Sequence, residues 1–79
     1  MITRQMLIDA VTEALENKDV VSESNSDNTE GWDSLGQLSI LSKLDEITGG
    51  KSSEIDGLAS CISIQHLVEK LKSNNLISD

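Results

Sequence analysis

The sequence predicts an all-α fold, a four-helix bundle of three main helices and one short helix. Apolar residues recur at helical spacing in three separate segments, and the 79 residues include no proline. Hydrophobic residues make up 37% of the chain, and aromatic residues only 1%. These features favour helices over strands joined by tight turns, and they suit one domain, residues 1–79, with a modest aliphatic core.

The first helix is expected at about residues 3–16, with Thr3 as its N-cap and Asn17 at its end. Its buried stripe follows the i, i+3, i+4, i+7 rule through Leu7, Ala10, Val11 and Ala14. Residues 17–33 then form a long, mostly polar loop. Loops of this length inside compact domains are usually functional or disordered, so this loop marks a candidate functional region.

The second helix is expected at about residues 34–48, with Asp33 as its N-cap and two glycines ending it. Its core stripe comprises Ile40, Leu41, Leu44 and Ile47. Leu35 and Leu38 lie on another face of this helix. Two interpretations stay open for these leucines: they form a docking surface beside Ser34, or they pack into the core.

Two further helices are expected in the last third of the chain. A short helix is expected at about residues 56–60, with Ile55 and Leu58 pointing inwards. The last helix is expected at about residues 63–73, with Ser63 as its N-cap. Its stripe of Ile64, Leu67, Val68 and Leu71 has the spacing of a buried helical face.

The charge balance restricts the classes of partner. Fourteen acidic residues against six basic ones leave a formal net charge of −8. Such a surface disfavours nucleic acids and anionic membranes, and it favours proteins with basic patches. No apolar run has the length of a signal peptide or a membrane span, and the one cysteine cannot form an internal disulfide. We therefore expect a cytoplasmic monomer without a membrane span.

Neither a metal site nor an enzymatic activity is expected. His66 and Cys61 are the only histidine and cysteine, and their spacing does not indicate a metal site. Cys61 is expected to be a small buried hydrophobe, and His66 an exposed or capping helix residue. A hydrolase based on Ser34 would need a general base and an oxyanion hole, and the Gly-x-Ser-x-Gly elbow is absent.

Ser34 falls in the first turn of the second helix, where unpaired backbone N–H groups and the helix dipole favour a phosphate. From Asp33 to Glu46 the segment reads DSLGQLSILSKLDE, which resembles the acyl carrier protein family. The resemblance extends over essentially the whole chain, because the long loop, the helix order, the length and the acidity agree. It is most specific over residues 32–47.

The resemblance implies a carrier without catalysis of its own. A phosphopantetheinyl transferase would attach 4′-phosphopantetheine to the Ser34 hydroxyl, and Asp33 would cap the helix and assist that metal-dependent transferase. A loading enzyme would then place an acyl group on the arm as a thioester, for transfer by downstream enzymes. The implied docking residues are Trp32, Leu35, Leu38, Ser39, Ser42, Asp45 and Glu46.

Several residues depart from the family's pattern. Gly36 and Ser39 stand where carriers of fatty acid synthesis usually have acidic residues, Lys43 adds a positive charge, and Thr48 replaces a frequent aromatic. The sequence Trp-Asp-Ser-Leu-Gly resembles stand-alone carriers of specialised pathways, such as surface polysaccharide, polyketide, lipid or amino-acid-derived metabolite synthesis. Trp32 either contacts the arm or a partner, or it packs as a hydrophobic staple against the second helix.

Three functions remain open at this point. The first is an acyl carrier, and the second is a carrier of an activated amino acid of the D-alanyl or peptidyl type. Both would use a modified Ser34, so the sequence does not separate their cargoes. The third is an acidic helical adaptor that binds a partner without any modification.

Overall fold

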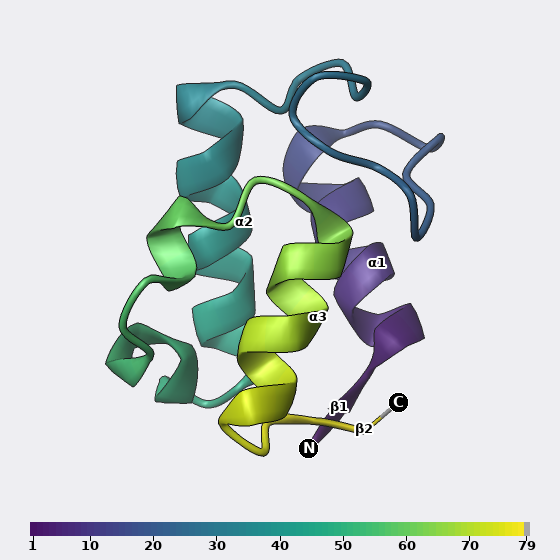
Figure 1. Cartoon of the computed structure of the whole chain (residues 1–79). Coiled ribbons are helices and arrows are strands. Elements are labelled where there is room, and N and C mark those ends of the chain that lie inside the picture. The colour runs from purple at the N-terminus through teal and green to yellow at the C-terminus, as the bar shows by residue number, and fades with distance from the viewer. Residues whose placement is uncertain (79) are drawn as a thin grey trace.

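The structure is a computed structural model that describes residues 1–78. Within them lie three α-helices, α1 (Arg4–Leu15), α2 (Ser34–Ile47) and α3 (Ile64–Ser73). Figure 1 shows α1 running opposite to α2 and α3, so the long connection after α1 crosses the end of the molecule where α2 and α3 begin. The predicted three main helices are therefore present and in the predicted order.

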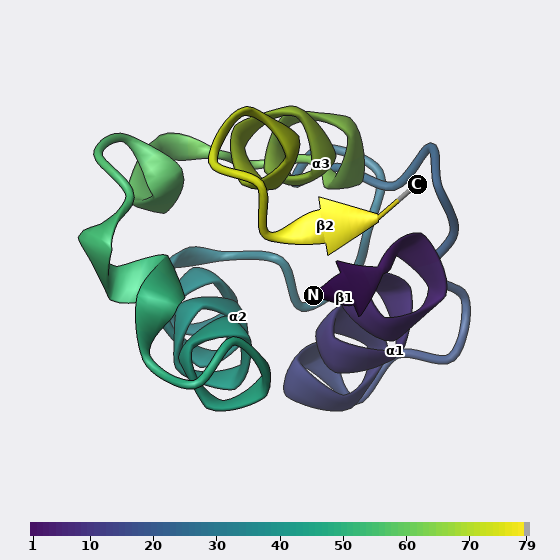
Figure 2. The same ribbon diagram turned by 90° about the horizontal axis from the view of Figure 1, so that it is seen from below.

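The fold is mostly helical, but a small strand pair adds to the helices. β1 (Ile2–Thr3) and β2 (Ile77–Ser78) pair in parallel, with Ile2 opposite Ile77. Figure 2 shows the pair beside the helices at the end opposite the loop, where both isoleucines are buried. The all-α prediction missed this pair because two-residue strands are too short for an alternating pattern.

The three predicted N-caps are confirmed by their hydrogen bonds. Thr3 Oγ1 accepts from the Met6 N–H at 3.1 Å, Asp33 Oδ1 from Gly36 at 2.9 Å, and Ser63 Oγ from His66 at 3.1 Å. The first helix ends one residue before its predicted end, because Glu16 has a left-handed backbone with φ 52°.

The predicted short helix at 56–60 is wrong in extent and type. The chain instead forms two 3-10 helices, Lys51–Glu54 and Leu58–Ser60. Gly57 has a φ of 83° immediately before the second one, which is incompatible with a continuous right-handed helix through this residue. The expected inward positions of Ile55 and Leu58 are confirmed, because both side chains are buried.

The core lies between the three helices and follows the predicted stripes. Its largest fully buried side chains come from all three helices: Leu7, Val11, Ile40, Leu44, Ile64, Leu67 and Leu71. On α2 the stripe is narrower than predicted, since Leu41 and Ile47 are only half-buried. In residues 1–78 we find no helix with the length and apolar character needed to cross a bilayer.

Candidate functional site at the start of α2

Ser34 is the first residue of α2, and it is exposed. Its neighbour Asp33 has an extended backbone, and the carboxylate of Asp33 caps the Gly36 N–H. The Asp33 carbonyl accepts the first helical hydrogen bond, from the Gln37 N–H at 2.8 Å. The N–H groups of Ser34 and Leu35 have no carbonyl partner within the helix, so the local field at the Ser34 hydroxyl favours a negative charge.

Gly36 explains how the loop approaches this helix so closely. A Cβ atom at this position would overlap the Gly31 carbonyl oxygen and would lie 2.7 Å from Cδ2 of Leu15. No residue with a side chain fits here without movement of the backbone. The glycine after Asp-Ser-Leu is therefore a packing requirement of this chain.

Gln37 connects three segments through one side chain, which we call the Gln37 bridge. Its Oε1 accepts from the Trp32 indole N–H at 2.7 Å. Its Nε2 donates to the carbonyls of Ala59 at 3.1 Å and Cys61 at 2.9 Å. The bridge holds the end of the loop and the segment before α3 against the first turn of α2. Sequence reasoning missed it, because the two carbonyls are 22 and 24 residues away and any residue type supplies them.

Trp32 is packed into the core rather than displayed on the surface. Its exposed fraction is 4%, and it belongs to the main hydrophobic cluster. Of the two interpretations offered by the sequence, the structure favours packing against the start of α2. A partner that docks on this face would meet little of the Trp32 side chain.

Exposure excludes one of the two open interpretations of the leucine face, the packing of both leucines into the core, and leaves the docking surface as a prediction. Leu35 is 76% exposed and Leu38 is 63% exposed, so neither packs into the core. The structure also leaves the remaining predicted docking residues of α2 exposed: Ser39, Ser42, Asp45 and Glu46. All of them lie on one helix that begins at Ser34.

Lys43 modifies the charge of this face. Its Nζ lies 2.8 Å from Glu13 Oε1 on α1 and 3.9 Å from Glu46 Oε2. The hydrogen bond to Glu13 raises the pKa of Lys43, against a smaller opposing effect of desolvation. The charge of Glu46 is therefore partly offset by its neighbour.

An open groove of about 540 Å³ runs beside Ser34. Apolar side chains dominate its walls, and its polar members include Ser34 and the Gln37 amide. The groove is lined by Ser26, Trp32, Asp33, Ser34, Gln37, Leu38, Leu41, Ala59 and Ile62. Sequence reasoning missed Ser26, which lies in the loop before α2, and Ala59 and Ile62, which lie in the segment before α3. A ligand attached to the Ser34 hydroxyl would meet this groove first.

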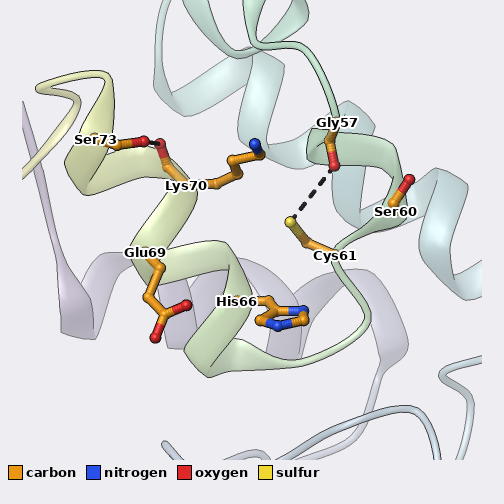
Figure 3. Close-up of a pocket in the computed structure, with 7 residues that line it drawn as sticks. All are labelled: Gly57, Ser60, Cys61, His66, Glu69, Lys70 and Ser73. Atoms are coloured by element: carbon orange, nitrogen blue, oxygen red, sulfur yellow. Dashed lines mark hydrogen bonds between the residues drawn. The ribbon is translucent and has the colours of Figure 1, made fainter.

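A second cavity lies on the other side of the segment before α3, around Cys61 (Figure 3). The buried Cys61 thiol donates to the Gly57 carbonyl at 3.6 Å, and desolvation raises the thiol pKa. His66 is exposed in the first turn of α3. Within residues 1–78 no three His, Cys, Asp or Glu side chains are grouped to hold a metal ion. A buried, protonated thiol is chemically inert, so this cavity is a weaker candidate site than the groove.

Comparisons with known proteins identify no relative of this chain. No protein-family model, no curated protein and no solved structure matches the chain. The functional interpretation therefore depends on the chain's own residues, above all on the exposed serine at the start of α2.

Proposed function

We propose that the chain is a carrier protein that holds acyl groups on a 4′-phosphopantetheine arm attached to Ser34 and presents them to enzymes of a specialised biosynthetic pathway. One observation carries the proposal. An exposed serine hydroxyl occupies the first position of a capped helix, beside an apolar groove and two exposed leucines. These features fit the covalent attachment of a long ligand that must stay accessible to other proteins.

The attachment step is a phosphoryl transfer from coenzyme A. The Ser34 oxygen attacks the phosphorus next to pantetheine, and a new serine–phosphate bond forms. The pyrophosphate bond of coenzyme A breaks, adenosine 3′,5′-bisphosphate leaves, and the serine proton passes to a base of the transferase. The start of α2 stabilises the resulting anionic phosphodiester by about 0.3–1 kcal/mol. Once bound, the arm supplies a thiol that forms thioesters.

The exposed face of α2 supports the exchange of partners. Leu35 and Leu38 offer apolar contact close to the attachment point, and Asp45 adds negative charge further along the helix. With a formal net charge of −8, the chain attracts enzymes that carry basic patches. Contacts of this kind accelerate association without requiring tight binding, which suits a carrier that visits several enzymes.

The proposal is tested by the intact mass of the protein after incubation with coenzyme A, Mg²⁺ and a broad-specificity phosphopantetheinyl transferase. The native chain is expected to gain one phosphopantetheine, and Ser34→Ala none. Ser73→Ala is the matched control, since Ser73 is an exposed serine at the end of α3, outside the predicted docking residues, and it should be modified like the native chain. If the native chain stays unmodified while a known carrier is modified in parallel, the acidic adaptor becomes the better interpretation.

Cargo identity is a separate question from attachment. An aminoacyl group would use the same serine and the same arm, so the mass experiment supports both kinds of carrier equally. The groove beside Ser34 bears on this question, because its depth decides which cargoes the protein could shelter.

A further inference from the structure

The Gln37 bridge lies one turn after Ser34 and joins three segments of the chain. It spans the space between the first turn of α2 and the segment before α3, with one acceptor bond and two donor bonds between 2.7 and 3.1 Å. A chain entering between α2 and that segment would separate these partners. The Trp32 N–H and the Cys61 carbonyl would then lose hydrogen bonds that are partly buried, whereas the bond to the Ala59 carbonyl is exposed and water could replace it.

The space behind the bridge is already occupied. The Trp32 side chain is 4% exposed, and Ile40 and Leu44 on the inner face of α2 have no exposed surface. The open volume that Ser34 itself lines is the groove whose walls include Leu38, Leu41 and Ile62. Ile62 is 49% exposed, so this wall remains in contact with solvent.

From this arrangement, and resting on the carrier function proposed above, we propose that the Gln37 bridge keeps an attached cargo in the open groove and out of the interior. The chain would then carry short or polar groups rather than long aliphatic chains. A short group needs no burial, whereas a long chain held in the groove would leave much of its apolar surface in water. Gln37 acts here as a positioning residue, through Trp32 and the segment before α3.

The test compares a short and a long cargo on the same protein. Acetyl- and dodecanoyl-phosphopantetheine are transferred from the corresponding acyl-coenzyme A to Ser34, and the melting temperature and Trp32 fluorescence are measured. Trp32 is the only aromatic residue and its indole N–H donates to Gln37, so its emission reports whether the bridge has opened, and the melting temperature is the independent readout. We expect both quantities to be the same for the two cargoes on the native chain. A dodecanoyl cargo that raises the melting temperature and shifts the emission of the native chain would overturn the proposal.

Variants of the bridge give a second readout. Gln37→Met keeps a side chain of similar length but removes all three hydrogen bonds, so the long cargo should now shift both quantities. Gln65→Met is the matched control, because Gln65 is exposed on α3 and donates to Glu69 at 3.0 Å; it should behave like the native chain. If Gln37→Met does not fold, Gln37→Glu retains the acceptor for Trp32 and loses both donor bonds. If a folded variant of Gln37 gives the same melting temperature and emission with both cargoes, Gln37 is not the barrier.

A chemical arm separates this proposal from the carrier function itself. In a Ser34→Cys, Cys61→Ala protein, ethyl and dodecyl maleimide attach to position 34 without any transferase. With Gln37 present, the ethyl and dodecyl groups should give the same melting temperature and the same Trp32 emission. With Gln37→Met, the dodecyl group should shift both quantities. If the transferase fails to modify Ser34 while the maleimide results agree with expectation, the carrier function is wrong but the closed interior stands. If the transferase modifies Ser34 but the dodecyl group shifts both quantities with Gln37 present, the carrier function stands and the proposed role of the bridge is wrong.

Discussion

The starts of α2 and α3 use the same local device but present different surfaces. In each, a side-chain oxygen accepts the N–H three residues later, from Asp33 in α2 and from Ser63 in α3. Figure 1 shows both starts at the end of the molecule crossed by the long loop. At α3 the loop covers the helix end: the Ile64 N–H donates to the Ser24 carbonyl at 3.0 Å, and Asn25 bridges to Ser63.

The difference shows that capping alone does not make a helix start a binding site. The first residue of α3 is Ile64, which is fully buried, whereas the first residue of α2 is the exposed Ser34. The loop uses the end of α3 to anchor itself and leaves the end of α2 open. Function is therefore expected at the start of α2, and stability is expected to depend on the start of α3.

Replacing the first residue of α2 or of α3 with alanine should give the largest difference in stability between the two helix starts. Ile64→Ala removes a fully buried side chain and should lower the free energy of unfolding by about 2–5 kcal/mol. Because a core of this size stabilises by only about 3–5 kcal/mol, that variant should lose a large part of the stability of the fold and unfold at a much lower urea concentration. Ser34→Ala should leave the urea midpoint nearly unchanged while abolishing modification. Equal losses of stability in the two variants would contradict the division of roles.

Gly36 provides the next test, since it makes the open helix end possible. Gly36→Ala places a Cβ against the Gly31 carbonyl and Leu15, so the loop must move. We expect a loss of roughly 1–3 kcal/mol in the free energy of unfolding, measured by urea denaturation. Ser39→Ala, on the exposed side of the same helix, should be close to neutral. A neutral Gly36→Ala would show that the close approach is dispensable.

The sequence predicted well what is repeated along the chain or depends on near neighbours. Helical spacing located the three main helices, and single residues such as Thr3, Asp33 and Ser63 marked their starts. A cap needs only an oxygen and an N–H three residues away, so its cause is local. Whether the first helical residue is open is not local in this way, since Ser34 is exposed and Ile64, the first residue of α3, is buried.

What the sequence did not predict depends on segments that meet only in the folded chain. The parallel pair of Ile2 and Ile77 requires three helices to bring both ends together. The Gln37 bridge uses backbone carbonyls, which carry no sequence signal. The exposure of Leu35 and Leu38 could not be decided from spacing, because two apolar stripes on one helix fit either a broad core contact or a free face.

The N-caps Asp33 and Ser63 should contribute equally to the stability of the protein, but only Asp33 should affect modification of Ser34. Asp33→Ala and Ser63→Ala each remove a cap bond and should lower the free energy of unfolding by about 1 kcal/mol. Asp33→Ala should also slow phosphopantetheine transfer, measured as the initial rate by intact mass, whereas Ser63→Ala should not. Asp33→Asn retains a good cap without the charge. If it is modified at the native rate, the role of Asp33 is confined to capping.

The smallest effect on stability is expected for the exposed leucines. Leu38 is 63% exposed, so Leu38→Ala should change the free energy of unfolding by less than about 0.5 kcal/mol. Leu67→Ala on α3 is the matched control, since the same truncation there removes a fully buried side chain and should cost about 2–5 kcal/mol.

The exposed leucines should affect enzyme binding although they hardly affect stability. If the face that begins at Leu35 contacts enzymes, Leu35→Ala and Leu38→Ala should raise the KM of the transferase for the folded protein while leaving its melting curve unchanged. An apolar side chain at the rim of an attachment site contributes binding energy only when a partner covers it. Native KM values in both variants would show that the transferase recognises Ser34 through the helix start alone, with the exposed leucines left for other enzymes or for none.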